Sequence, residues 1–287
     1  MRLFRIGTLA DWFGVGLLDG IRQSERVGAE GVQLYAAGEL DPNTLTATDI
    51  RMVKRVAADC SQTISALCGE LGGHGLCLPE ENSQKIAYLK RTVDLALALD
   101  CTVVTTHLGV IPVDQENPTY RVLQDACGEV GAYAKRHGAC IAIETGPEPV
   151  ERLVSFIDSC TAGGLAINYD PANLVMVLCA DEVQGVYQGG GRIVHTHAKD
   201  GRNLVPTTGE EHYALFAEGG VDATRKIKRT EQTPIGLGCV RWPEYLSALK
   251  EIGYRGFLTI EREVKGETTT AEIAQAVVFL REHMARI

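Results

Sequence analysis

Acidic and histidine side chains stand at the ends of several short apolar segments of this 287-residue sequence. CTVVTT is followed by His107, CIAI by Glu144, LAINY by Asp170, RIVHT by His197 and FLTI by Glu261. A charged group at the end of an apolar segment has a high desolvation cost unless it is paired or bound to a metal. If these segments are strands whose ends meet, the three carboxylates would repel one another without a cation between them. The pattern therefore predicts one divalent metal ion.

The predicted ligands are Glu144, Asp170, His197 and Glu261. Carboxylate oxygens with a single imidazole favour an octahedral ion, so Mn2+ is the first choice, with Mg2+, Co2+ and Zn2+ as other candidates. Such an ion polarises a bound carbonyl and lowers the pKa of the neighbouring C–H. Glu144 and Glu261 would then flank the substrate as the catalytic base and acid.

Three of these positions also have a purely structural interpretation. Glu144 could belong to the first turn of a helix, where acidic residues are favoured. Asp170 could form an Asx turn before the proline that follows it. His107 is a candidate substrate contact, or else a structural hydrogen-bonding residue. The alignment of all these residues at segment ends is more specific than any one of them.

Two residue pairs leave the choice of ligand open, because both members share one face of a strand. His195 and His197 are two positions apart, and we favour His197 because it lies nearer the end of the strand. Glu261 and Glu263 have the same spacing, and Glu261 directly ends the apolar run.

Eight short segments rich in β-branched residues alternate with longer amphipathic segments. The amphipathic segments include residues 83–100, 121–138 and 242–254, and the predicted strands are residues 3–9, 31–35, 63–68, 101–107, 140–144, 165–169, 192–197 and 257–261. Eight such units predict a single-domain (β/α)8 TIM barrel over residues 1–287, in which functional side chains lie at the C-terminal ends of strands. A doubly wound open sheet is the alternative, although no G-x-G-x-x-G follows the first strand.

Composition restricts the partners and the compartment. The net charge of −9 and the pI of about 5.3 argue against nucleic acid and anionic membranes as partners. The nine cysteines include no C-x-x-C pair and read as small buried apolar residues in a reducing compartment. We expect a cytoplasmic protein, because neither a secretory signal nor an apolar membrane span is apparent.

The segments IAIETG, NYDPAN and HTHAKD, together with the closing segment GLGCVRWPEYLSALKEIGYRGFLTIERE, resemble the sugar phosphate isomerase/epimerase superfamily with its xylose-isomerase-like barrel. That superfamily includes ketose 3-epimerases, inosose isomerases and dehydratases, and hydroxypyruvate isomerases. The resemblance implies a metal site formed by Glu144, Asp170, His197 and Glu261. It also implies that the two glutamates exchange a proton on opposite faces of a cis-enediolate.

The resemblance further suggests substrate-binding residues. Arg202 has the position of an arginine that binds substrate shortly after the metal-binding histidine. Asn173 stands where many members have a histidine, which departs from the ketose epimerases and from the endonuclease branch. His107 and Glu70 are also assigned to the substrate, and Trp12 either forms an apolar wall against a sugar ring or packs in the core.

Residues 201–238 form an unusually long predicted loop after the seventh strand. Long loops in this position are commonly lids or oligomer contacts, and the alternative is a solvated insertion. A homo-oligomer, either a dimer or a tetramer, is compatible with this feature.

The sequence therefore predicts an isomerase or epimerase that moves a proton beside the metal-bound carbonyl of a small sugar, keto-sugar or inosose. The alternative is a lyase that uses the same metal and glutamate pair for dehydration or β-elimination. An apurinic-site endonuclease would need a three-metal cluster and a basic surface, whereas this acidic chain has only seven histidines. A non-enzymatic binding barrel would not require three carboxylates around a metal.

Overall fold

Eight parallel strands close into a barrel in the computed structural model, which describes residues 3–264, 266 and 268–287. Their order around the barrel is β1-β10-β7-β6-β5-β4-β3-β2. The strands are Arg5–Leu9 (β1), Gly31–Tyr35 (β2), Thr63–Cys68 (β3), Val103–Thr106 (β4), Cys140–Glu144 (β5), Leu165–Tyr169 (β6), Ile193–Ala198 (β7) and Phe257–Ile260 (β10). The predicted (β/α)8 barrel is confirmed, and no strand boundary differs from its prediction by more than two residues.

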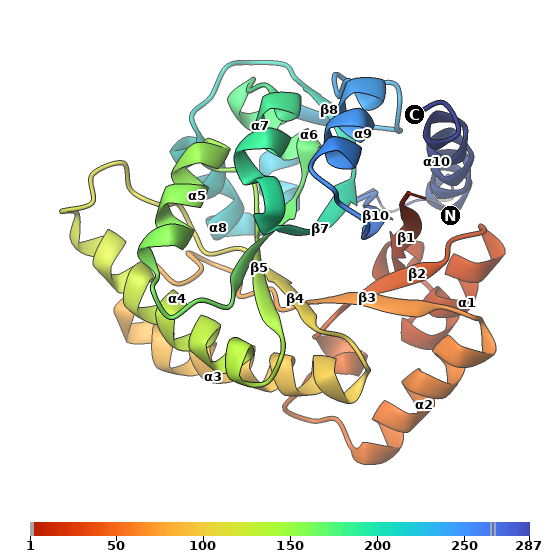
Figure 1. Ribbon diagram of the computed structural model, residues 1–287, viewed down its shortest axis with the longest axis horizontal. Coiled ribbons are helices and arrows are strands. Elements are labelled where there is room, and N and C mark those ends of the chain that lie inside the picture. The colour runs from red at the N-terminus through yellow and green to blue at the C-terminus, as the bar shows by residue number, and fades with distance from the viewer. Residues whose placement is uncertain (1–2, 265, 267) are drawn as a thin grey trace.

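Helices surround the strands, and the first strand lies beside the last helix (Figure 1). The longer helices are Leu17–Arg26 (α1), Ala47–Asp59 (α2), Pro79–Ala98 (α3), Pro118–Arg136 (α4), Val150–Ser159 (α5), Glu182–Gly189 (α7), Trp242–Glu251 (α9) and Thr269–Met284 (α10). Four short helical segments are Ala10–Phe13 (η1), Gly38–Leu40 (η2), Pro171–Asn173 (α6) and Gly190–Arg192 (η4). A fifth, Leu174–Leu178 (η3), is a π-helical turn.

Local sequence signals explain where several helices begin. Thr46 accepts a hydrogen bond from the backbone of Asp49, whose side chain bonds back to Thr46 and completes a capping box for α2. Asn117 caps α4, and Pro118 occupies its first turn. Because these caps satisfy backbone N–H groups that have no partner inside the helix, they position the helices against the barrel.

The core lies inside the barrel and between the strands and the helices. Ile141, Ile143 and Ile167 are fully or almost fully buried, as expected for parallel strands that are covered on both faces. The helix α9 contributes Trp242 and Tyr245 to the outer layer. All nine cysteines are free, and the buried ones pack as small apolar side chains, namely Cys60, Cys68, Cys101, Cys127 and Cys160.

The segment predicted as a long loop, residues 201–238, is structured. The strands Asp200–Asn203 (β8) and Thr230–Thr233 (β9) pair with each other in antiparallel orientation. The helical segment Gly209–Ile227 (α8) connects them along the chain. Helix α8 is interrupted at Gly219 and Gly220, and the positive φ of Gly220 is a conformation that glycine adopts readily.

Asp200 holds the base of this insertion in place. Its buried carboxylate accepts hydrogen bonds from the backbone of Gly236, Gly238 and Val240 and from Nε1 of Trp242. Asp200 therefore connects the end of β7 to the start of α9, which fixes where the insertion leaves and rejoins the barrel.

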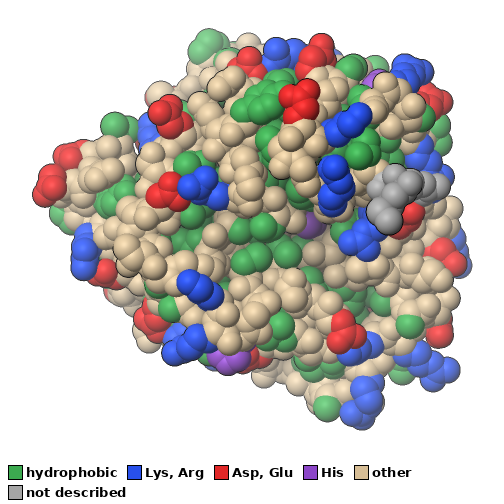
Figure 2. Space-filling view, in the orientation of Figure 1, with side chains coloured by type: hydrophobic (Ala, Val, Ile, Leu, Met, Phe, Trp, Pro, Cys, Tyr) green, Lys and Arg blue, Asp and Glu red, His purple; other side chains and the backbone are tan. Residues whose placement is uncertain are grey.

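The charge of the surface and the length of the helices indicate which kinds of partner are compatible with the structure. On the face drawn in Figure 2, Lys and Arg side chains are interspersed with Asp and Glu side chains. None of the helices in the described part of the chain combines the length and apolarity needed to cross a membrane.

Candidate metal centre

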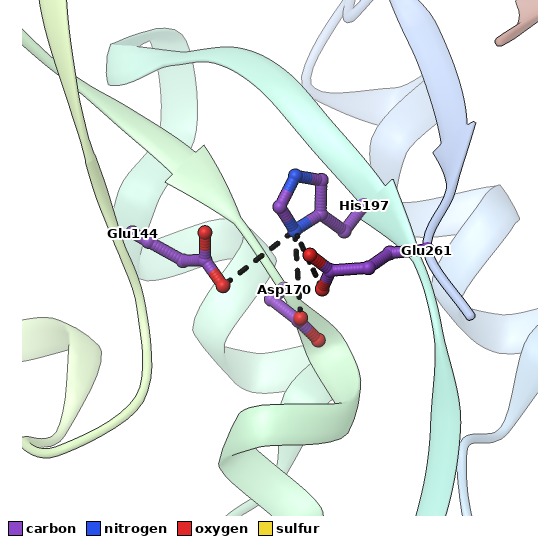
Figure 3. A group of neighbouring side chains, drawn as sticks. All are labelled: Glu144, Asp170, His197 and Glu261. Atoms are coloured by element: carbon purple, nitrogen blue, oxygen red, sulfur yellow. Dashed lines mark ion pairs between the residues drawn. The ribbon is translucent and has the colours of Figure 1, made fainter. Parts of the chain in front are cut away.

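Four side chains from four barrel strands converge at one point of the barrel rim (Figure 3). Nδ1 of His197 lies 3.5 Å from Oε1 of Glu144, 3.6 Å from Oδ2 of Asp170 and 3.3 Å from Oε2 of Glu261. One donor atom of each residue lies within 4.8 Å of the others, and all four residues are buried. Neighbouring ligands of a small ion at about 2.1 Å lie roughly 3 Å apart, so this spacing suits a single divalent cation.

The orientation of His197 leaves one ring nitrogen free for an ion. Nε2 of His197 lies 3.1 Å from Oε1 of Gln33, and Gln33 in turn donates to Oγ1 of Thr105 at 3.0 Å. Because the amide nitrogen of Gln33 donates to Thr105, its oxygen faces His197 and is placed to accept a proton from Nε2. Nδ2 of Asn168 lies 3.2 Å from the same ring nitrogen, so Nε2 is engaged by protein groups in either tautomer. Nδ1 has no hydrogen-bond partner within the described part of the chain. Metal-binding histidines commonly have this arrangement, with the second nitrogen hydrogen-bonded to a fixed acceptor.

Asp170 caps a short helix with one carboxylate oxygen and leaves the other available to a metal ion. Its Oδ1 accepts hydrogen bonds from the backbone of Ala172 and Asn173, so it caps the short helix α6. Its Oδ2 is buried and has no hydrogen-bond partner among the residues that the structure describes. The backbone of Asp170 is tied to Thr145 by two hydrogen bonds, which joins the ends of β5 and β6. The cap therefore aims the second oxygen at the metal centre.

Glu144 ends β5 and is held by donors on both oxygens. Asn168 donates to Oε2 and Asn173 donates to Oε1, each at 3.0 Å. Nε2 of His107 lies 3.5 Å from Oε1, and Nδ1 of His107 is hydrogen-bonded to Glu70 at 2.7 Å. Three of the predicted substrate contacts thus surround Glu144, and Asn173 contacts its carboxylate directly.

Glu261 follows β10 and is paired with a buried lysine that sequence analysis did not identify. Nζ of Lys199 lies 2.9 Å from Oε2 of Glu261, 2.9 Å from Oε2 of Glu263 and 3.4 Å from Oδ2 of Asp170. Lys199 lies two residues after His197, on the same face, and this spacing is the signal that could have indicated it. Glu261, rather than Glu263, contacts His197.

The second histidine of β7 belongs to the core. Nδ1 of His195 bonds to Oδ1 of Asn168 at 2.8 Å, and its Nε2 lies 3.0 Å from Oγ1 of Thr259. Burial lowers the pKa of His195 to about 3, with a further contribution from His197, so the ring is neutral. Both nitrogens are satisfied, and His195 cannot serve as a ligand.

The protonation states within the group formed by Glu144, Asp170, His197 and Glu261 favour the binding of a cation. Burial alone would raise the pKa of Glu144 and Glu261, but His197 and His107 lower that of Glu144 well below its usual value. Lys199 and His197 lower the pKa of Glu261 to about 2. Burial would lower the pKa of His197, but Glu261 and Glu144 raise it well above its usual value. Glu144 and Glu261 are therefore ionised and attract whatever positive charge the site can hold.

Replacing Lys199 with methionine is expected to lower the stability of the metal-free protein by about 3–5 kcal/mol, because the carboxylates around it would lose their buried counter-charge. Thermal unfolding should show a melting temperature roughly 10 °C below that of the parent. The exposed Lys250→Met variant is the control and should change little. Saturating Mn2+ should stabilise Lys199→Met more than the parent, and an unchanged metal-free melting temperature would contradict this account.

The loop after β5 contains a buried acid, Glu148, whose Oε2 accepts a hydrogen bond from the backbone of Ile111 at 3.3 Å. Burial raises the pKa of Glu148 to about 8, although Ile111 and Arg152 oppose the shift. The folded protein therefore keeps a proton that the unfolded chain releases above its ordinary glutamate pKa. Stability should fall as the pH rises from that ordinary value to about 8, and then level off.

The Glu148→Gln variant is therefore expected to be more stable than the parent by about 2–4 kcal/mol at pH 8, with little gain in mild acid. Urea unfolding at several pH values measures this difference. The exposed Glu151→Gln on helix α5 should not alter the pH profile. A Glu148→Gln variant that is destabilised at every pH would show that the buried acid contributes a favourable contact instead.

A cavity of about 650 Å³ opens above the metal centre. It is lined by Trp12, Glu70, His107 and Asn173, so four of the five predicted substrate contacts face it. Arg202 does not line it: its guanidinium bonds to the backbone oxygen of Leu237 and pairs with Glu231. Arg202 lies on β8, and its pairing with Glu231 holds it within the insertion, so its role toward a substrate stays a prediction that the cavity does not support.

Comparison with known proteins places these features in a wider group. Residues 21–283 match the model of a family described as xylose isomerase-like TIM barrel. An uncharacterized protein of Methanocaldococcus jannaschii is 25% identical over 186 residues, which cover 61% of this chain and 55% of that protein. The match thus extends over about half the length of that curated relative.

Solved structures share the whole fold. A xylose isomerase domain protein from Planctomyces limnophilus is 24% identical, with a TM-score of 0.80, and the match covers 100% of this chain and 98% of that chain. A D-psicose 3-epimerase from Clostridium cellulolyticum H10, solved with D-tagatose, is 14% identical, with a TM-score of 0.74 over 98% and 99% of the two chains. A xylose isomerase-like TIM barrel protein from Mycobacterium smegmatis, solved with magnesium, is 16% identical, with a TM-score of 0.72 over 99% and 97%.

Proposed function

Because the chain belongs to the family of xylose isomerase-like TIM barrels, we propose that it is a divalent-metal-dependent isomerase or epimerase of a small sugar, keto-sugar or inosose. One observation carries the proposal: Glu144 and Glu261 approach His197 from opposite sides, and both line the cavity (Figure 3). A D-psicose 3-epimerase and a magnesium-bound barrel protein among the structural neighbours support the substrate class and the metal.

Glu144, Asp170, His197 and Glu261 would hold the ion, and Mn2+ or Mg2+ suits this set of donors. A bound divalent cation supplies Lewis acidity, which polarises a carbonyl and lowers the pKa of the C–H beside it. Burial of the four residues places them in surroundings of low dielectric constant, which strengthens the electrostatic interactions among them.

In this proposal the two glutamates move the proton. Glu144 is ionised, as a general base must be, and the donors Asn168 and Asn173 fix the direction of its carboxylate. Glu261, on the opposite side, would return a proton that it receives from Lys199, whose Nζ lies 2.9 Å from its Oε2. Solvent would then reprotonate Lys199 and take up the proton that Glu144 removed. Proton transfer between such positioned groups contributes roughly 10²–10⁴-fold to the rate of an enzyme.

His107 would bind a substrate oxygen next to the reacting carbon. Burial would lower its pKa, but Glu144 and Glu70 raise it well above the usual value, so the ring is a cationic donor. A cationic donor is suited to an oxygen on which negative charge develops. Glu70 fixes the ring through its bond to Nδ1.

A panel of ketoses, ketose phosphates, inososes and 3-keto-glycosides, each incubated with the Mn2+-loaded protein, tests this function. The proposal expects one class to yield a product of the same mass as the substrate, identified by NMR. A product that is lighter by water or by an alcohol would identify the alternative, a lyase using the same proton-abstracting glutamate. No conversion of any class would contradict the proposal.

A further inference from the structure

The cavity above the metal centre has two chemically different parts. Near the centre it is lined by ionised and hydrogen-bonding groups such as Glu144, His107 and Lys199. Apolar side chains also line it, from three separate segments: Trp12 of η1, Met176 and Val177 of η3, and Tyr213, Phe216 and Ala217 of α8. These six residues are called the apolar wall below.

The apolar wall is a fixed part of the cavity because α8 is anchored at its start and at its aromatic face. Gly209 packs so closely on the backbone oxygen of Pro147 that a Cβ would lie 1.7 Å from it. Tyr213 is buried, and its ring lies 5.7 Å from that of Phe216, which in turn lies 5.7 Å from the ring of His107. The wall therefore begins directly beside the predicted catalytic groups.

One aromatic side chain such as Trp12 suits the C–H face of a sugar ring, but a wall of six apolar or aromatic residues offers few hydrogen-bond partners to sugar hydroxyls. Hydroxyl groups buried against apolar side chains lose their hydrogen bonds with water and gain none, which is unfavourable. An apolar ring in the same place gains from burial and from contact with aromatic side chains. The volume of about 650 Å³ is in the range of roughly 300–1,000 Å³ typical of pockets that enclose ligands much larger than one sugar ring.

We propose that the substrate is a keto-sugar that carries an apolar, ring-sized substituent, and that this substituent lies against the apolar wall beneath α8. The sugar part rests on the function proposed above, with its carbonyl at the metal centre. The substituent extends past His107 toward Phe216. The inserted helix α8 is thus the specificity element of the site.

Calorimetric titration of the Mn2+-loaded protein with two glucosides tests this inference without requiring turnover. The probes are 4-nitrophenyl β-D-glucopyranoside and methyl β-D-glucopyranoside, which differ in the substituent alone. We expect the aryl glucoside to bind roughly 10–100-fold more tightly, as burial of an aromatic ring in contact with aromatic side chains implies. Equal affinities, tighter binding of the methyl glucoside, or no measurable binding of either would overturn the inference.

Substitutions in α8 test whether the aryl group of the glucoside binds at the apolar wall. Phe216→Ala should lower the affinity for the aryl glucoside by roughly tenfold and leave that for the methyl glucoside nearly unchanged. Ala217→Trp should block the aryl glucoside by filling the space along the wall. Leu215→Ala, on the same helix but not among the residues lining the cavity, is the matched control. An aryl preference that persists unchanged in Phe216→Ala and Ala217→Trp would overturn the assignment to the wall.

The two proposals fail in different ways. Absence of chemical conversion with every keto-sugar class, despite an aryl preference in binding, contradicts the catalytic function and leaves the apolar subsite standing. Conversion of free ketoses together with no aryl preference contradicts the apolar subsite and supports the catalytic function.

Discussion

The Glu144→Gln variant is expected to lose roughly 10³–10⁴-fold in kcat, because an amide cannot accept the proton that the reaction removes. The replacement has nearly the same shape and keeps an oxygen for Asn168 or Asn173 to bond. It also removes one charged ligand, so the rates must be compared at saturating Mn2+. Steady-state kinetics with the substrate found in the panel measure the loss.

Comparing Glu144→Gln with Glu261→Gln shows whether Glu144 acts as the base or only as a metal ligand. Both variants lose one carboxylate of the metal centre, so both should bind Mn2+ more weakly. The variant that retains the proton-abstracting glutamate should still exchange the substrate proton with solvent while forming little epimer. Full turnover by Glu144→Gln at saturating Mn2+ would contradict the role assigned to it.

The Asp170→Asn variant is expected to bind Mn2+ at least about 100-fold more weakly. Loss of groups that only orient a ligand already costs roughly 10–100-fold, and Asp170 is proposed as a ligand itself. Asparagine is as good an N-cap as aspartate, so the hydrogen bonds to Ala172 and Asn173 should survive. Calorimetric titration with Mn2+ measures the affinity, and thermal unfolding in a chelator verifies the fold.

Asp181 offers a matched control for that experiment. It caps α7 with two backbone hydrogen bonds, as Asp170 caps α6, but it is not part of the four-residue group. Asp181→Asn should therefore leave the affinity for Mn2+ unchanged. If Asp170→Asn also binds Mn2+ like the parent, the assignment of Oδ2 as a ligand is wrong.

The grouping of the four predicted ligands could be anticipated from sequence because parallel strands of a barrel present their C-terminal ends on one rim. The residue at the end of each short apolar run was therefore a candidate ligand. In the structure, one donor atom from each of Glu144, Asp170, His197 and Glu261 lies within 4.8 Å of the others. The choice of His197 over His195 also follows from position, since the earlier histidine points into the layer between Asn168 and Thr259.

Other features depend on contacts between segments that are distant in sequence. Gln33 orients His197 across 164 residues, and nothing local to either residue indicates the bond. The spacing of Lys199 from His197 indicates a shared face, but only the fold shows that β10 brings Glu261 to 2.9 Å from Nζ of Lys199. Arg202 was assigned by its position after a motif, but the fold of the inserted hairpin decides where its side chain goes.

The insertion is the largest difference between expectation and structure. Its composition offered no strong hairpin signal, and the two strands that pair are separated by the whole of α8. The apolar face that α8 presents to the cavity is recognisable only in the structure, where Met176 and Trp12 line the same cavity.

The most direct test of the central claim is the incorporation of solvent deuterium at the carbon beside the carbonyl. The reaction is run in D2O with metal-stripped protein, with the same protein reloaded with Mn2+, and with the reloaded Glu144→Gln variant. We expect deuterium in the product of the reloaded parent only. Product that forms without deuterium, or exchange that persists in the metal-stripped protein, would contradict metal-dependent proton transfer by these glutamates.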